Sequence, residues 1–199
     1  MKEMNILRKK SLKIIVSLFL IFVMLFSFTI NTFAAGSAYT LLPYSLNGGV
    51  GNWGYTKRYY WIDSSASDIS NTIIAAYNSW IYTSDILATP ISWRQTTTKS
   101  SGTVEFYTYS SADGNNGYTS FWCYNNAVNP EQKNWGWCMI YYNKRYDAGQ
   151  GTLAHEIGHT MGLNENNTNP DTVMCQAGSG RRVTTPQLGD LQGINAKYN

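Results

Sequence analysis

The segment LAHEIGHTMGLNENNTNPDTVMCQ places the strongest constraint on the fold of this 199-residue chain. His155 and His159, its only histidines, flank Glu156 in the pattern H-E-x-x-H. Side chains four residues apart share one face of an α-helix, so both imidazoles can reach one metal ion. We therefore predict a helix over 149–162 that carries a metal site and is ended by Gly162.

These residue types indicate hydrolytic zinc chemistry. Zinc binds histidine nitrogen at about 2 Å and lowers the pKa of a coordinated water towards 7. Glu156, one position along the helix, can take a proton from that water as general base. A catalytic zinc normally has three protein ligands, and the chain has no third histidine. The third ligand must therefore be of another residue type.

The pattern continues through Gly162 to Glu165, ten residues after the first histidine, and on to Asp171-Thr172-Val173-Met174. On these residues the sequence resembles the metzincin metalloproteases, whose motif H-E-x-x-H-x-x-G-x-x-H has a third zinc ligand at the tenth position. It is most similar to the matrixin-like bacterial members, over about residues 55–198. Glu165 stands where the family usually has His.

The resemblance implies an α+β protein with a metzincin-like zincin fold. A twisted, mostly parallel or mixed sheet would carry a backing helix and an active-site helix, followed by a small C-terminal subdomain with the Met-turn and a terminal helix. It also implies a zinc endopeptidase that hydrolyses protein or peptide substrates through a zinc-bound water. His155, His159 and Glu165 would hold the zinc, Glu156 would be catalytic, and Met174 would be the structural Met-turn.

The third ligand is open to alternatives. A carboxylate is a competent zinc ligand, but its negative charge should raise the pKa of the bound water, so we expect a higher pH optimum or lower activity. Asp190 on the last helix and Asp171 are the main alternatives to Glu165, and the amides of Asn164 and Asn166 are nearby in the sequence. Asp190 is otherwise expected to hold the last helix against the active-site helix.

The two residues that follow Met174 also bear on the site: Gln176 departs from the family pattern, and Cys175 is a possible zinc ligand. Gln176 stands where some metzincins have a Tyr that assists the metal site. Cys175 is expected to be a packed small hydrophobe, with an inhibitory zinc ligand as the alternative.

Two functions of another class compete with an endopeptidase. One is a secreted binding or interaction module that keeps a metzincin fold with weak or no catalysis. The other is an exported carbohydrate binder built on exposed aromatic side chains, in which H-E-x-x-H is coincidental. The intact Glu156 favours the enzyme, because a structural zinc site needs no base beside it.

Residues 1–34 are predicted to be a signal peptide. Five basic residues accompany an apolar run over 14–30, and Thr32-Phe33-Ala34 offers small residues for cleavage. The alternative is an uncleaved membrane anchor. We expect a secreted, extracellular, bacterial protein that has no membrane association after cleavage.

Removal of this segment leaves ten Lys and Arg against eleven Asp and Glu, a formal charge of −1. This balance gives no reason to expect a nucleic-acid partner. The remaining residues are enough for one domain, and we expect a monomer. We divide them into a turn-rich segment, 35–54, and a catalytic domain, 55–199.

Two further sites are suggested. Cys123 and Cys138 flank a loop-like segment and are predicted to form a disulfide outside the cell, although both could be buried thiols. The 113–117 loop offers oxygen ligands for Ca²⁺, which metzincins often bind. A plain hairpin turn is the favoured interpretation of that loop.

The remaining elements follow from periodicity. A helix over 69–81 should be capped by Ser67 or Asp68, and a last helix should begin at Pro186 with Thr185 as its cap. Runs rich in β-branched and aromatic residues predict strands over 55–62, 91–95, 104–109, 118–124 and 137–142.

Overall fold

The computed structural model describes residues 37–51, 58–146 and 149–199. The predicted signal peptide lies outside these residues. Within the described ranges, no helix is both long and apolar enough to cross a membrane.

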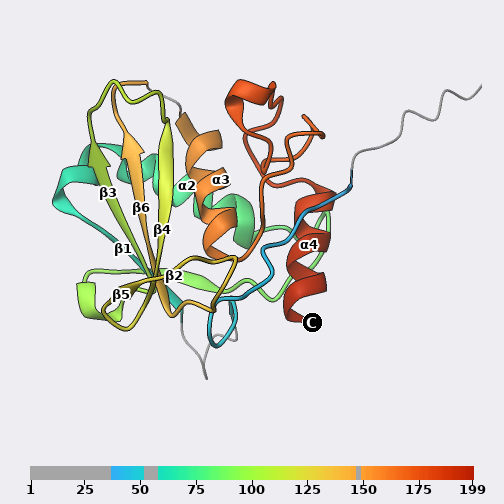
Figure 1. Ribbon diagram of the computed structural model, residues 1–199, viewed down its shortest axis with the longest axis horizontal. Coiled ribbons are helices and arrows are strands. Elements are labelled where there is room, and N and C mark those ends of the chain that lie inside the picture. The colour runs from blue at the N-terminus through green and yellow to red at the C-terminus, as the bar shows by residue number, and fades with distance from the viewer. Residues whose placement is uncertain (1–36, 52–57, 147–148) are drawn as a thin grey trace, which may run out of the picture. The chain divides into compact units, whose positions relative to one another are not determined.

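The fold is built on a mixed sheet with the strand order β2-β1-β3-β6-β4-β5 (Figure 1). The strands β2, β1, β3 and β6 run parallel to one another, whereas β4 is antiparallel to both β6 and β5. The predicted α+β class is confirmed. The strands are β1 (Arg58–Ile62), β2 (Trp93–Thr96), β3 (Val104–Tyr109), β4 (Gly117–Cys123), β5 (Asn126–Ala127) and β6 (Trp137–Asn143).

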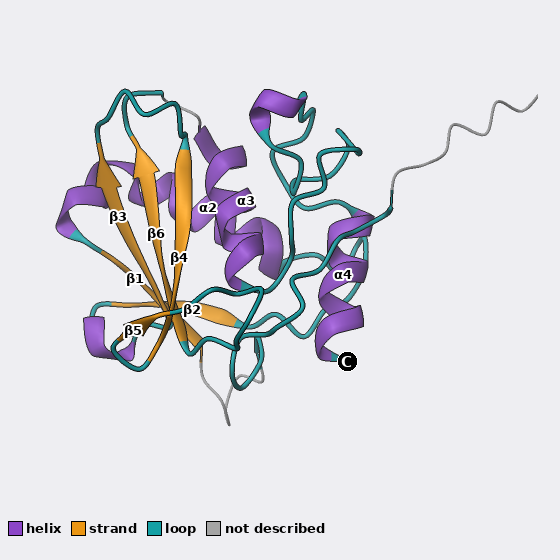
Figure 2. Cartoon of the chain, in the orientation of Figure 1, coloured by secondary structure: helices purple, strands orange, loops and turns teal. Residues whose placement is uncertain are grey.

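The two faces of the sheet differ in burial. Along β6, Cys138, Ile140 and Tyr142 are buried, and the residues between them are half-buried. Helices α2 (Ser70–Ile81) and α3 (Gly149–Thr160) lie together beside the sheet (Figure 2). On the half-buried side, aromatic rings contact one another across β1, β3, β6 and β4, among them the stacked pairs Tyr107–Tyr141 and Tyr118–Tyr141. Many aromatic residues are therefore used in packing within the sheet.

Helix α2 begins later than its periodicity predicts. Ser64–Ile69 form the 3₁₀ helix η1, and the Asp63 carboxylate caps it by accepting a hydrogen bond from the Ser65 amide. The predicted caps Ser67 and Asp68 lie inside this 3₁₀ turn, so that prediction was wrong. Of the apolar stripe that periodicity predicts, Ile73, Ala76, Tyr77 and Trp80 are buried, whereas Ile69 is half-buried at the end of η1.

Helix α3 is fixed in the core by two indole groups. Trp80 on α2 donates its ring N–H to the carbonyl of Ala154 over 3.0 Å. Trp135, which precedes β6, donates to the carbonyl of Thr160 over 3.1 Å. These bonds fix both halves of the helix relative to α2 and the sheet. The chain leaves the helix at Gly162, whose φ of 87° is in the left-handed region that favours glycine.

The last helix, α4 (Leu188–Tyr198), has a different cap from the predicted Thr185. Gln187 is the N-cap, and the Asp190 side chain accepts a hydrogen bond from the Gln187 amide over 2.8 Å. This reciprocal capping box takes the place of a helix start at Pro186. Of the apolar stripe that periodicity predicts, Leu191 and Ile194 are buried and Tyr198 is partly buried, whereas Leu188 is exposed.

Cys123 and Cys138 do not form the predicted disulfide, because all three cysteines are free thiols. Phe121 on β4 stands opposite Cys138 on β6. Cys123 lies two residues further along β4 and pairs with Asn126 of β5. Diagonal neighbours of this kind are about 7–8 Å apart, beyond the roughly 4.4–6.8 Å that a disulfide spans between Cα atoms. The register of the sheet thus keeps the two residues apart.

The turn at 113–117 does not form a hairpin. It connects β3 to β4, and β6 lies between these two strands. The Asp113 carboxylate accepts hydrogen bonds from the Asn115 amide at 3.0 Å and from Nδ2 of the buried Asn143 at 3.3 Å. These bonds stabilise the turn, whereas Ca²⁺ binding there stays a prediction.

Candidate metal centre

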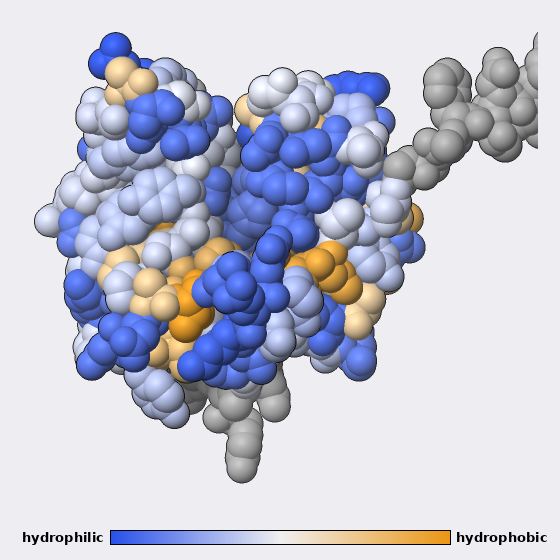
Figure 3. Space-filling view, viewed as in Figure 1, coloured by the Kyte–Doolittle hydropathy of each residue, from blue (hydrophilic) through white to orange (hydrophobic). Residues whose placement is uncertain are grey.

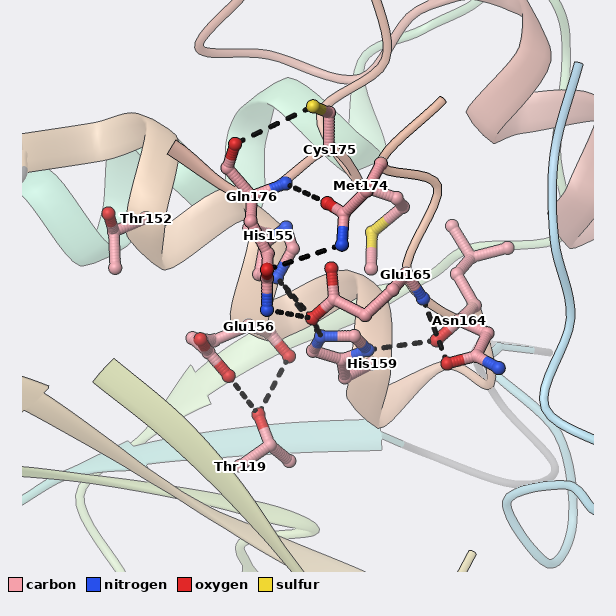
Figure 4. Close-up of polar contacts among 12 residues, drawn as sticks. Thr119, Thr152, His155, Glu156, His159, Asn164, Glu165, Met174, Cys175 and Gln176 are labelled. Carbon is pink, nitrogen blue, oxygen red and sulfur yellow. Dashed lines mark hydrogen bonds and ion pairs between the residues drawn. The ribbon is translucent and has the colours of Figure 1, made fainter. Parts of the chain in front are cut away.

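The two histidines of α3 are held in matching orientations. Nδ1 of His155 lies 2.9 Å from the carbonyl oxygen of Val173, and Nδ1 of His159 lies 3.0 Å from that of Leu163. A carbonyl can only accept, so each Nδ1 carries a proton, and in the neutral form of each imidazole Nε2 presents a lone pair. The two Nε2 atoms lie 3.1 Å apart (Figure 4). Such backbone partners are typical of metal-binding histidines.

Glu165 completes a group of three. Its Oε1 lies 3.3 Å from Nε2 of His155 and 3.3 Å from Nε2 of His159. In the described part of the chain, these three residues form the group whose ligand atoms could hold a metal ion. The turn at Gly162 lets Glu165 approach the helix that carries the histidines.

The alternative acids lie elsewhere. Asp190 is buried, and its carboxylate accepts hydrogen bonds from the Thr172 hydroxyl and from the Val173 amide at 3.1 Å. Burial raises the pKa of Asp190, and the hydrogen bond from Thr172 opposes that rise. Asp171 is exposed and lies 3.5 Å from Nη1 of Arg182. Asp190 therefore ties α4 to Thr172 and Val173. The expected contact was instead with α3, the helix that carries the histidines.

The charges of the three grouped side chains are coupled. Burial raises the pKa of Glu165, but hydrogen bonds and charge interactions with His155 and His159 outweigh it and lower the pKa to about 2. Burial lowers the pKa of His159, but the hydrogen bond with Glu165 and the charges of Glu156 and Glu165 raise it above 6.5. The group thus favours an ionised carboxylate facing the two rings.

The spacing of these atoms fits a small metal ion. Tetrahedral coordination with bonds of about 2.0–2.1 Å places ligand atoms about 3.3–3.4 Å apart. The three observed separations are 3.1, 3.3 and 3.3 Å. In addition, Oε2 of Glu165 is buried and has no hydrogen-bond partner among the described residues. A cation beside this carboxylate would compensate its charge. Two imidazoles and a carboxylate suit several divalent metals, so the donors alone do not fix the identity of the ion.

Met174 packs directly against α3, the helix that carries the two histidines. A Cβ atom added to Gly158 would lie 2.3 Å from Sδ of Met174 and 3.2 Å from the ring of Trp80. Glycine at 158 therefore gives the thioether access to the helix between the two histidines. The turn that carries Met174 is closed by hydrogen bonds from the Met174 amide to the Thr172 hydroxyl and from the Cys175 amide to the Thr172 carbonyl. The sequence analysis did not single out Gly158, although it lies within the motif.

Glu156 is buried and faces the neighbouring strand. The hydroxyl of Thr119 on β4 lies 2.7 Å from Oε2 of Glu156 and 3.1 Å from its backbone carbonyl (Figure 4). Gly117 on the same strand has no side chain to separate β4 from α3: a Cβ there would lie 3.6 Å from Cγ of Glu156. Thr119 was missed because nothing in the sequence links β4 to the motif.

An open cleft of about 610 Å³ runs past these residues. Figure 3 shows it as a hollow between the sheet and the C-terminal loops, with mostly hydrophilic residues along it. One wall is formed by the first half of β4, including Tyr118 and Thr119, and the opposite wall by 176–178 and Arg181. His155, Glu156, His159 and Glu165 line its floor.

Gln176 contacts the site from two residues beyond Met174. Its Nε2 donates to Oε1 of Glu165 over 3.2 Å. Asn167 holds Gln176 at two points, through the Gln176 amide at 2.8 Å and through Oε1 of Gln176 at 3.2 Å. Gln176, which stands where some metzincins have a Tyr, therefore orients the side chain of Glu165. Cys175 is buried, as expected of a small hydrophobe, and it is not in the metal group.

The segment before β1 supports the loop that carries Glu165. In Figure 1 it runs beside the C-terminal loops and α4. The Leu42 amide donates to the Gly162 carbonyl, and the Asn164 amide donates to the Thr40 carbonyl, each over 2.9 Å. The Thr40 hydroxyl lies 2.6 Å from the Glu165 carbonyl oxygen. A region predicted only as turn-rich thus forms one side of the metal centre.

Comparisons with known proteins do not assign this chain to a family. No protein-family model matches it, and no curated protein matches it. The feature that indicates a function is the site itself: a His-His-Glu group that could hold a metal ion, beside a buried glutamate at the base of an open cleft.

Proposed function

We propose that the protein is a secreted zinc-dependent endopeptidase with a metzincin-like fold. The observation that carries the proposal is the position of Glu156, which follows the first histidine of a group able to hold a metal and lines the same open cleft. A metal site with only a structural role would be closed and would need no adjacent carboxylate.

His155, His159 and Glu165 would hold the zinc ion. Bound zinc acidifies a coordinated water and polarises a carbonyl group, which is the chemistry that peptide hydrolysis requires. The hydrogen bonds from the two Nδ1 atoms to backbone carbonyls keep both Nε2 atoms available for this role.

Glu156 would move the protons. The Thr119 hydroxyl donates to Oε2 of Glu156, which leaves Oε1 without this partner and able to accept a proton from the attacking water. The same carboxyl group can then donate that proton to the leaving amine of the cleaved peptide bond. Thr119 fixes the carboxylate in one rotamer, which reduces the cost of aligning it with the substrate.

Strand β4 would bind the substrate backbone. Its first residues pair with β6 on one side, whereas β5 pairs only with Trp122 and Cys123 at its far end. The Phe121 carbonyl accepts a hydrogen bond from the Val128 amide, so the edge from Gly117 to Ser120 is the part that offers backbone groups to an extended peptide lying in the cleft. A peptide bound along this edge would lie alongside Glu156.

The test compares wild-type protein with Glu156→Gln on casein and on a mixed peptide library. We expect Glu156→Gln to bind one zinc per chain, as wild type does, and to lose at least 100-fold in kcat/KM. Equal cleavage by both proteins would refute the proposed mechanism. Zinc content by mass spectrometry separates loss of the base from loss of the metal.

A second candidate is a binding module with weak or no catalysis. The carboxylate of Glu165 favours it, because a third anionic ligand makes the metal a weaker acid than three neutral histidines would. In this case wild-type protein would bind zinc and peptides, but would cleave neither casein nor the library.

A further inference from the structure

We propose that Arg181 selects substrates that carry a carboxylate within one or two residues of the cleaved peptide bond. This inference rests on the proposed peptidase function. It names a substrate class for the cleft and gives a role to a cation that the proton chemistry at Glu156 does not use.

Arg181 is the only lysine or arginine among the described residues that line the cleft. Its side chain packs against the start of α3, where a Cβ on Gly151 would lie 3.2 Å from Nη2 of Arg181. Glycine at 151 therefore leaves room for the guanidinium group against the helix. The other ionisable groups of the described lining are the two histidines, Tyr118 and three glutamates, at 131, 156 and 165. Arg181 is thus the one fixed positive charge that the described lining offers to a substrate.

The guanidinium group is half-buried without a close counterion. Its hydrogen bonds go to neutral oxygens at long distances: 3.4 Å to the carbonyls of Val173 and Cys175, and 3.5 Å to the Thr152 hydroxyl. Within the described residues, no carboxylate lies within 4.0 Å of it. Burial lowers the pKa of Arg181, and the charges of Cys175, Glu156 and Glu165 oppose this only from a distance. A partly desolvated cation with no anion in contact gains from an anionic ligand.

The next residue shows that this environment is specific to Arg181. Arg182 is exposed and lies 3.5 Å from the carboxylate of Asp171. It does not line the cleft. Two adjacent arginines therefore differ in burial and in partner, and Arg182 provides a matched control of the same type and charge.

The position of Arg181 sets the distance from the reacting bond. Its contact residue Thr152 precedes His155 by three positions, about 4.5 Å along the helix axis at 1.5 Å per residue. An extended peptide advances about 3.3 Å per residue. A substrate carboxylate one or two residues from a scissile peptide bond bound beside His155 can therefore reach the guanidinium group of Arg181. A side chain of Asp or Glu and the C-terminal carboxylate of a short peptide present the same chemistry there.

The experiment uses zinc-loaded full-length mature protein and an acetylated decapeptide series. In the series, Glu, Gln or Lys replaces one residue at a time along an otherwise alanine- and leucine-containing peptide. Each peptide is made with an amidated C-terminus, and truncated peptides are made with free and amidated ends. For wild type we expect kcat/KM to be at least ten-fold higher for Glu than for Gln at one position next to the cleaved bond. A preference that needs a free C-terminus would assign the carboxylate to the peptide end.

The variants separate charge from packing. Arg181→Gln should remove the ten-fold preference, Arg181→Glu should reverse it in favour of Lys, and Arg181→Lys should retain part of it. Arg182→Gln should keep the wild-type preference. A preference for Glu that is unchanged in Arg181→Gln and Arg181→Glu would overturn the inference. So would equal cleavage of Glu and Gln peptides by wild type, which would leave the proposed peptidase function intact.

A binding measurement keeps the test independent of catalysis. Zinc-loaded Glu156→Gln protein is titrated with the same peptides by fluorescence anisotropy. We expect the Glu peptide to bind at least ten-fold more tightly than the Gln peptide, and Arg181→Gln in this background to abolish the difference. If wild type cleaves nothing, this titration still decides whether Arg181 recognises a carboxylate. Equal binding of the two peptides would refute it.

Discussion

The hydroxyl oxygen of Thr40 lies 2.6 Å from the backbone carbonyl oxygen of Glu165, although 125 positions separate the two residues. The same hydroxyl lies 2.9 Å from the Asn164 carbonyl. Thr40 therefore holds the loop that brings the Glu165 carboxylate to the two histidines. A hydrogen bond from a segment that is remote in the sequence thus supports Glu165, the one residue of the His-His-Glu group that is not a histidine.

Replacement of Thr40 by Val should weaken metal binding. The change keeps the shape of the side chain and removes the hydroxyl, so the Glu165 loop loses an orienting bond. We expect zinc affinity, measured by competition with a chelator, to fall about ten-fold, which is the lower end of the effect of residues that orient metal ligands.

Thr108→Val is the matched control for this experiment. The Thr108 hydroxyl donates to the Ser65 carbonyl over 2.6 Å, so the same kind of bond is lost away from the metal centre. Zinc affinity should not change in this variant. An equal loss of affinity in both variants would show that Thr40 acts through general stability.

Replacement of Asp190 by Ala should destabilise the protein without removing the metal. Asp190 is 1 % exposed and links α4 to Thr172 and Val173. Its loss leaves buried donors without partners, so we expect the free energy of unfolding to fall by about 2–4 kcal/mol in urea denaturation.

Two measurements complete the test of Asp190. Asp171→Ala should cost less than about 0.5 kcal/mol, because its ion pair with Arg182 is exposed on both sides. Folded Asp190→Ala should still bind one zinc per chain. Loss of zinc with normal stability would instead identify Asp190 as a ligand.

The metal-free protein should lose stability in acid because of Glu165. The pKa of this carboxyl falls from 4.5 to about 2 in the folded protein, so the ionised form is favoured by folding. Its contribution is complete above about pH 4.5 and is lost as the pH falls towards 2. We expect a loss on the order of 2 kcal/mol, after allowance for screening of a side chain that is one-third exposed.

The measurement is urea denaturation of chelator-treated protein between pH 6 and pH 2.5. Glu165→Gln should flatten the dependence in this range, whereas Glu131→Gln, an exposed glutamate of the same cleft, should follow wild type. Parallel curves for wild type and Glu165→Gln would contradict the coupling between Glu165 and the histidines.

Replacement of Thr119 by Val should lower kcat and leave KM nearly unchanged. The variant loses the hydrogen bond to Oε2 of Glu156, so the carboxylate is less well aligned. We expect a fall of about ten-fold in kcat on a peptide substrate, with normal zinc content. Adding Thr119→Val to Glu156→Gln should cause no further loss, because both changes act on one group. Independent, multiplying effects would show that Thr119 does not act through Glu156.

The local sequence was sufficient wherever neighbours in the chain decide the structure. The four-residue spacing of His155 and His159 places both on one face of α3, and Gly162 ends the helical segment as predicted. Strand 104–109 and the buried stripe of α2 follow from their own periodicity. These features depend on backbone geometry and on the separation of polar from apolar faces, which a short window of sequence contains.

Only the tertiary structure decided which distant groups meet. Glu165 and Asp190 are both acids downstream of the histidines. In the fold, Glu165 lies beside His155 and His159, whereas Asp190 accepts a hydrogen bond from Thr172. The register of β4 on β6 separates Cys123 from Cys138 and brings Thr119 to Glu156. The physical reason is that sheet order and register are set by the burial of whole faces against the core, so no single pair of residues carries the information for its own contact.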